Sequence, residues 1–117
     1  MREILFRGKR KDNGEWIYGD LVHWWGRHNT KPDIQIYNNI QRFNVIPETV
    51  GQYTGLTDKN GKKIFEGDVV IWCGIKGIVV WEGHKFYIKS NLLWDFSDDD
   101  CIEIIGNIHD NPELLKE

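Results

Sequence analysis

The chain has 117 residues and a formal net charge of −3, and 13% of its residues are aromatic while alanine is absent. This length fits one domain, the aromatic content favours sheet over helix, and the negative charge disfavours a general nucleic-acid binder. No apolar run approaches the ~18 residues of a membrane span, and the charged start lacks a secretion signal, so we expect a cytoplasmic protein without a membrane partner.

The first predicted element is a β-hairpin at Asn13-Gly14, because these residues favour the left-handed backbone of a tight turn. The preceding basic run, RGKRK from Arg7 to Lys11, is interpreted as the solvent-facing part of an edge strand, where charge blocks unwanted pairing. A two-residue turn would pair Phe6 with Leu21, Arg7 with Asp20 and Lys9 with Tyr18.

Short strands are predicted along the rest of the chain. LVHWW continues the hairpin strand, and IQIY and IQRFNVI lie on either side of Asn38-Asn39. Beyond Gly67, strands are predicted in DVVIWC, GIVVWEG, KFYIKS and IEIIGNI, a spacing typical of a small barrel. The end of the chain predicts one or two helical turns, with Asp110 or Asn111 as the cap and Pro112 at the first helical position.

The segment TGLTDKNGKKIFEGDVV, from Thr54 to Val70, is rich in glycine and acidic residues, so it could be a calcium or phosphate loop. The calcium spacing fails because Leu56 and Gly67 occupy two ligand positions. The phosphate spacing fails because Lys63 stands where Ser or Thr is required. The segment therefore predicts a turn rather than a ligand site.

Asp58, Asn60 and Gly61 suit a type I turn that closes a hairpin with a left-handed glycine, and a two-residue Asn-Gly turn is the alternative. The segment Asp12 to Val22 matches Asp58 to Val70, apart from two extra residues in the second copy. We therefore expect two related hairpins.

Three blocks of the sequence resemble the YopX-like proteins of phages and prophages of bacteria: REILFRGKRKDNGEWIYGDLV, IPETVGQYTGLTDKNGKKIFEGDVV and IEIIGNIHDNPELL. The resemblance implies an SH3-like barrel with additional strands, a phage or prophage origin, and oligomers in at least some members. It implies no activity and no site residues. The prediction is a single all-β domain over residues 1–117, with an N-terminal hairpin and extra strands in 1–50, a barrel-like part in 51–117, and a short helical turn at the end.

No catalytic or metal-binding constellation is predicted. The four histidines and the cysteines Cys73 and Cys101 lack the Cys-x2-Cys or His-x3-His spacing of a zinc site, so we expect free thiols and neither metal nor cofactor. Asp20, Glu66 and Asp68 could be paired acids, but a Gly-Asp pair after a hairpin strand favours a bend with a side-chain cap. We therefore do not expect an enzyme.

Fifteen aromatic residues exceed what one domain of this size is expected to bury, and exposed aromatic patches tend to mark interfaces. Core packing is the alternative for each ring. The candidate interaction surface consists of five aromatics in or near irregular segments: Trp24, Trp25, Tyr37, Trp94 and Phe96.

Two functions from different classes are compatible with the sequence. The first is a non-catalytic module that self-associates as a homo-oligomer and binds a host or phage protein through these aromatics. The second is a nucleic-acid-binding protein, by analogy with SH3-like barrels that contain strands such as GDVV and GIVV. Residues 1–50 carry a net charge of +2 and residues 51–117 a net charge of −5, and the acidic part holds the predicted barrel, which disfavours nucleic acid.

Overall fold

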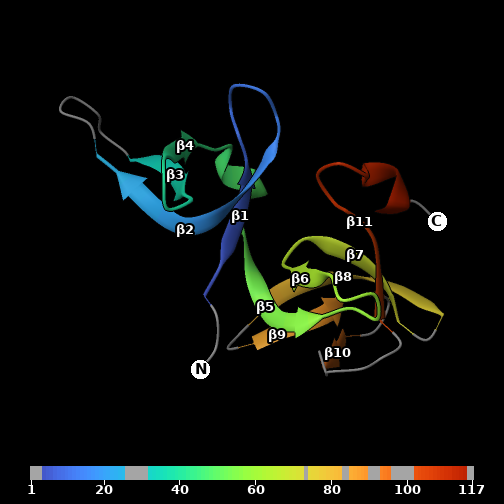
Figure 1. Ribbon diagram of the computed structural model, residues 1–117. Helices are drawn as coiled ribbons and strands as arrows, with labels where there is room; N and C mark the ends of the chain where they lie inside the picture. Colours follow the sequence, from blue (N-terminus) through green and yellow to red (C-terminus); the bar gives the residue numbers. More distant parts are fainter. Residues whose placement is uncertain are drawn as a thin grey trace. The chain divides into compact units, whose positions relative to one another are not determined.

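A computed structural model describes residues 4–25, 32–72, 74–82, 85–89, 93–95 and 102–115, and only the backbone at 93–95 and 115. The chain divides into two compact units, Met1–Gln52 and Tyr53–Glu117, and Figure 1 labels their strands. In both units the strands are antiparallel and most are joined by short turns. That the two parts form a single domain stays a prediction.

The first unit is a meander of four antiparallel strands to which the start of a fifth strand returns. The strands are β1 (Phe6–Lys9), β2 (Trp16–Trp24), β3 (Asp33–Tyr37), β4 (Arg42–Asn44) and the beginning of β5 (Gly51–Thr57). A 3-10 helix, η1 (Pro47–Thr49), connects β4 to β5. The hydrogen-bonded order is β4-β3-β2-β1-β5, so β1 pairs with a strand on each side.

The first hairpin turns over the four residues between Arg10 and Glu15 rather than over Asn13-Gly14 alone. The amide of Gly14 donates to the carbonyl oxygen of Arg10 at 3.0 Å, and the amide of Arg10 donates to the carbonyl oxygen of Glu15 at 2.9 Å. The predicted register is therefore wrong by two residues. The shift keeps every side chain on its expected face, because the faces of a strand alternate with period two. The observed pairs are Phe6 with Gly19, Arg7 with Tyr18 and Lys9 with Trp16.

The interpretation of Arg7 to Lys11 as part of an edge strand is also wrong. β1 lies between β2 and β5, and Arg7 is only 6% exposed. The guanidinium carbon of Arg7 lies 4.7 Å from the ring centroid of Trp16, and the ammonium nitrogen of Lys9 lies 5.7 Å from it. Strand pairing and an aromatic ring therefore surround these cations, and Lys11 is the exposed residue of the run.

The end of β1 is also joined to the chain that follows β4. A β-bridge pairs Arg10 with Val45, and the amide of Ile46 donates to the carbonyl oxygen of Lys9 at 2.9 Å. Val45 and Ile36 have no exposed surface. The strands of the first unit thus curl around a small core, with β1 in contact with both ends of the meander.

The second unit contains the rest of β5, which pairs with β6 (Lys63–Phe65), and a sheet of five strands. These five are β7 (Asp68–Trp72), β8 (Ile75–Glu82), β9 (Lys85–Lys89), β10 (Leu93–Asp95) and β11 (Ile102–Asn107). Their order is β10-β9-β8-β7-β11. A 3-10 helix, η2 (Pro112–Leu115), supplies the helical turn near the end of the chain. The core is one cluster of buried side chains: Ile64, Val70, Val79, Phe86, Ile88 and Ile102.

The hairpin between β5 and β6 turns at Asp58 to Gly61. The amide of Gly61 donates to the carbonyl oxygen of Asp58 at 3.0 Å, and Gly61 has a φ of +82°. The buried carboxylate of Asp58 accepts the amides of Asn60 at 2.8 Å, Lys62 at 2.9 Å and Ile104 at 3.1 Å. The bond to Ile104 ties the turn to β11, 46 residues further along the chain.

The two segments that match in sequence do not fold alike throughout. Gly19-Asp20 lies inside β2, whereas Gly67 has a φ of +94° and forms a turn between β6 and β7. The extra Glu66 of the second copy belongs to this turn. Both segments contain a hairpin turn, but only the second breaks its strand at the Gly-Asp pair.

The strand order is the same in the two units. In each, four strands form a meander and a fifth returns to pair antiparallel with the first. The all-β class is therefore confirmed. Among the described residues no pairing joins β10 to β11, so no closed ring is formed there, and the SH3-like barrel stays a prediction.

Candidate functional site

Two exposed aromatic side chains share one face of β2 and β3. Trp24 pairs with Asp33, and Tyr37 lies four residues further along β3. Cross-strand partners share a face, as do residues an even number apart, so Trp24 and Tyr37 lie on the same side, with backbones ~13 Å apart along the strand. Trp24 is 48% exposed and Tyr37 is 38% exposed, so both rings lie at the surface.

Arg42 links these two aromatic residues. It pairs with Tyr37 across β3 and β4, and its guanidinium carbon lies 5.2 Å from the ring centroid of Trp24. A cation over an indole ring is attracted by the negative face of the ring, which restrains both side chains. Trp25 follows directly, beyond the end of β2, and is 60% exposed, so it extends the exposed aromatic surface at this end of the strand, although strand alternation does not place it on the face of Trp24. We call Trp24, Trp25, Tyr37 and Arg42 the aromatic patch.

The opposite face of these strands packs against the core of the unit. Side chains therefore alternate along each strand between the core and the exposed face. Leu21 pairs with the buried Ile36 on that face. At the start of the β2–β3 pairing, a Cβ on Gly19 would overlap the carbonyl oxygen of Tyr37 and lie 2.8 Å from its carbonyl carbon. Glycine at this position therefore allows β3 to approach β2 next to the patch.

The remaining predicted surface residues have no described side chains. Trp94 lies in β10, where only the backbone is described, and Phe96 lies outside the described residues. The structure therefore places Trp24, Trp25 and Tyr37 in the first unit and leaves the other two predictions open.

Sequence reasoning missed Arg42 and the 45% exposed Trp81. The contact of Arg42 with Trp24 depends on the pairing of three strands, which no local pattern shows. Trp81 stands near the end of β8, next to Glu82, and a strand end before a Gly is a signal for exposure that could have been used.

Of the carboxylates that could have been paired acids, Asp68 acts as a cap. The buried Asp68 accepts the amide of Phe65 at 2.8 Å, as a bend with a side-chain cap requires. Burial raises the pKa of Asp58, but the amides of Ile104, Lys62 and Asn60 outweigh this effect and hold the pKa below its ordinary value. Asp20 is exposed on β2. Asp58 and Asp68 thus stabilise turns, and Glu66 lies in the turn between β6 and β7. That none of these carboxylates is catalytic stays a prediction.

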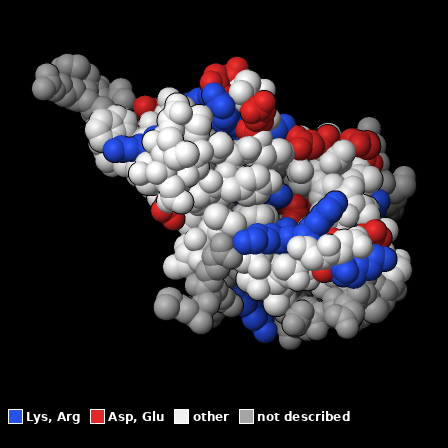
Figure 2. Space-filling model, viewed as in Figure 1, with Lys and Arg blue, Asp and Glu red and all other residues white. Residues whose placement is uncertain are grey.

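Charges of both signs are interspersed among uncharged side chains on the face that Figure 2 shows. Within the described residues, no group of three or more His, Cys, Asp or Glu could hold a metal ion. His28, His84, Cys73 and Cys101 lie outside those residues, so the expected absence of a metal and the free thiols stay predictions.

Strand order, cores and patch together define a small all-β protein in which each unit has a four-stranded meander and a returning fifth strand. Residues 5–116 match the family model described as YopX protein, so the chain belongs to the YopX family.

The fold is similar to that in a crystal structure of protein EF1440 from Enterococcus faecalis. The TM-score is 0.66 and the identity 23%, over 99% of this chain and 100% of that chain. At this identity the likeness shows the fold alone. None of the curated proteins compared matches the chain. In the described part of the chain, no helix has the length and apolar character needed to cross a membrane.

Proposed function

We propose that this YopX protein is a non-catalytic interaction module of phage or prophage origin that acts in the cytoplasm of the bacterial host. It self-associates through the aromatic patch, and a host or phage protein is its further partner. The observation that carries the proposal is the exposure of three large aromatic side chains, Trp24, Trp25 and Tyr37, in one part of the first unit.

The composition of the patch supports a protein contact. Trp, Tyr and Arg are the residues most enriched among those that dominate binding energy at interfaces. The stack of Arg42 on Trp24 restrains two long side chains before binding, so less conformational entropy is lost when a partner covers them. A closed dimer that covers ~800 Å² on each subunit would be sufficient for a stable contact.

The strand order of the first unit supports assigning the SH3-like barrel to residues 6–52. The meander curls until β1 pairs with β5 on one side and bridges Val45 beyond β4. The sequence interpretation placed the barrel in 51–117 instead. In this proposal the barrel is the rigid element that presents the aromatic patch.

The proposal is tested by the mass in solution. Light scattering at micromolar concentration is expected to give a mass well above the 13.8 kDa of one chain. The double variant Trp24→Ala/Trp25→Ala is expected to lower that mass. Trp81→Ala is the control, because it removes a 45% exposed indole from the second unit and is expected to leave the mass unchanged.

Two results would contradict the proposal. A monomer at every concentration would refute self-association. If the double variant has the same mass as the parent oligomer, the aromatic patch is not part of the contact, and Trp94 and Phe96 become the next candidates.

A further inference from the structure

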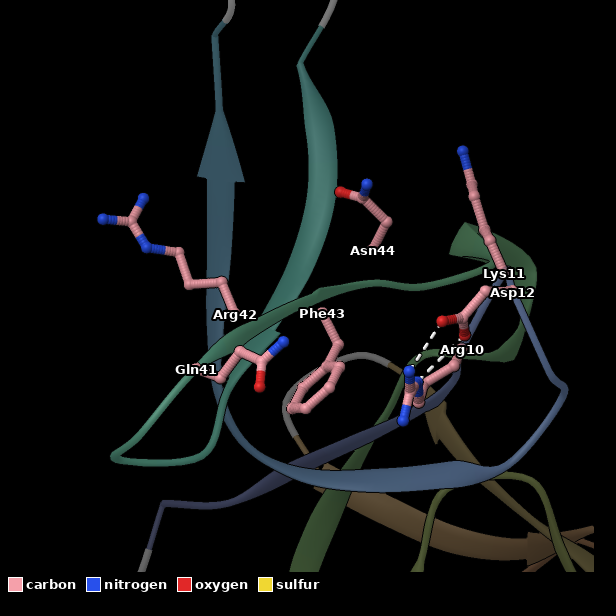
Figure 3. Close-up of a pocket in the computed structure, with 7 residues that line it drawn as sticks. All are labelled: Arg10, Lys11, Asp12, Gln41, Arg42, Phe43 and Asn44. Atoms are coloured by element: carbon pink, nitrogen blue, oxygen red, sulfur yellow. Dashed lines mark hydrogen bonds and ion pairs between the residues drawn. The ribbon is translucent and has the colours of Figure 1, made fainter.

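An open pocket lies between the first hairpin turn and β4. It has a volume of about 320 Å³ and lies within the first unit. Figure 3 shows its lining: Arg10, Lys11, Asp12, Gln41, Arg42, Phe43 and Asn44. The pocket exists because the amide of Lys11 donates to the carbonyl oxygen of Asn44 at 2.9 Å, which holds the turn beside β4.

One wall of the pocket is a planar cation fixed from two sides. Asp12 accepts hydrogen bonds from Nε of Arg10 at 2.9 Å and from Nη2 at 2.6 Å, so the guanidinium plane cannot rotate freely. The guanidinium carbon lies 4.4 Å from the ring centroid of Phe43. The Arg10 side chain is still 22% exposed. A fixed, partly exposed guanidinium backed by a phenyl ring is a stacking platform for another flat ring.

Polar groups with unused hydrogen-bonding capacity surround this platform. In the part of the chain that the structure describes, the side chains of Lys11 and Gln41 make no hydrogen bond or ion pair. Figure 3 shows Lys11 extending away from the joined Arg10 and Asp12. Asn44 accepts a hydrogen bond from Gln35 at 2.8 Å through its Oδ1, which leaves its amide nitrogen to donate.

The charge of the lining is positive. Three cations face one carboxylate, and that carboxylate is held by Arg10. Lys11 is therefore available to neutralise phosphate, while Gln41 and Asn44 offer the amide groups that recognise base edges. A flat base and an adjacent phosphate are present together in a nucleotide unit.

We propose that this pocket binds one nucleotide unit of a single-stranded nucleic acid, with the base on Arg10 and the phosphate beside Lys11. An acidic peptide is the weaker occupant, because it has no flat ring for the platform and would meet the carboxylate of Asp12. The site is separate from the self-association contact, and only Arg42 belongs to both.

The test is fluorescence anisotropy of the full chain with labelled single strands of about ten nucleotides, measured across a salt series. Lys11→Ala is expected to reduce the slope of log K against log salt by about 0.7, the value for one phosphate contact on a single strand. Arg10→Lys keeps the charge but removes the plane, so affinity is expected to fall about tenfold with the slope unchanged. Lys62→Ala removes an exposed lysine of the second unit and is expected to change neither quantity.

Three results would overturn the proposal. The first is no binding at low salt. The second is an equal loss in Lys11→Ala and Lys62→Ala, which would indicate unspecific attraction. The third is tighter binding of a poly-glutamate peptide with the same dependence on Arg10 and Lys11, which would assign the pocket to an acidic protein segment. Trp25→Ala leaves the stack of Arg42 on Trp24 in place and is expected to leave oligonucleotide affinity unchanged, so failure here is distinguishable from failure of the self-association proposal.

Discussion

The two units share one strand order but differ in where their large side chains lie. The second unit has a core cluster of six buried side chains, and Val69 is also fully buried. In the first unit Ile36 and Val45 are the buried hydrophobic residues among those described, whereas Trp24, Trp25 and Tyr37 are exposed. Among the side chains that the structure describes, the same arrangement of strands thus supports a larger core in the second unit and more exposed aromatic rings in the first.

The stacked cations differ in kind between the two units. In the first unit they include the arginines Arg7 on Trp16, Arg10 on Phe43 and Arg42 on Trp24. In the described part of the second unit they are lysines, Lys63 on Tyr53 and Lys85 on Tyr87. A guanidinium is planar and stacks on an aromatic ring more readily than an ammonium group, so the cations best suited to recognition lie in the first unit.

Gly19→Ala is expected to have the largest effect and tests how closely the first unit is packed. The new Cβ would overlap the backbone of Tyr37, which cannot move without separating β2 from β3. We expect the free energy of unfolding to fall by about 3 kcal/mol in urea denaturation. A loss below about 1 kcal/mol would show that β2 and β3 are not in close contact at this position.

Asp58→Ala tests the hydrogen bonds that join the β5–β6 turn to β11 in the second unit. The substitution leaves the amides of Asn60, Lys62 and Ile104 without their acceptor. We expect a loss of about 2–3 kcal/mol in the same assay. Asp58→Asn keeps an acceptor oxygen and is expected to lose less. Equal stability of the parent and the Ala variant would refute the tie between the turn and β11.

Gly14→Ala and Gly61→Ala compare the two hairpin turns directly. The φ angles are +74° and +82°, and no atom lies within 4 Å of an added Cβ at either site. The substitutions therefore cost only the strain of a left-handed backbone with a Cβ. The free energy of unfolding of each variant is expected to fall by about 1–2 kcal/mol. Thermal unfolding that shows a loss in only one of them would break the equivalence of the turns.

The smallest expected effect concerns acid. The pKa of Asp58 is lower in the folded chain than its ordinary value of 3.8, so its ionised form stabilises the fold above that value. This contribution is lost as pH falls from 3.8 through the folded pKa. Asp58→Asn is expected to lack this component when unfolding is measured across that range. A parallel pH dependence in parent and variant would contradict the lowered pKa.

The strands and turns could be predicted because their signals are local. Apolar alternation marked most strands, and Asp58 to Gly61 has the residues that its turn requires. The register of the first hairpin could not be predicted, because it depends on the bond between Gly14 and Arg10 rather than on the Asn-Gly pair. β10 was missed, since a strand of three residues carries little pattern.

The candidate sites were harder to predict than the strands. The exposure of Trp24 and Tyr37 follows from strand alternation once the core face is known. The contact of Arg42 with Trp24 and the platform of Arg10 on Phe43 join residues far apart in sequence. Such contacts depend on strand pairing, so a single sequence gives no direct signal for them.

If Trp24 and Trp25 form a contact surface rather than core, their removal should affect assembly but not the fold of one chain, and one experiment measures both. The masses of the parent and of Trp24→Ala/Trp25→Ala are measured by light scattering. Their thermal unfolding is then followed by circular dichroism, with each protein diluted until it is dissociated. We expect a lower mass at micromolar concentration and an unchanged unfolding temperature for the dissociated chains, because exposed rings contribute little to the fold of one chain. An unchanged mass with a markedly lower unfolding temperature would contradict this expectation and assign the two rings to the core.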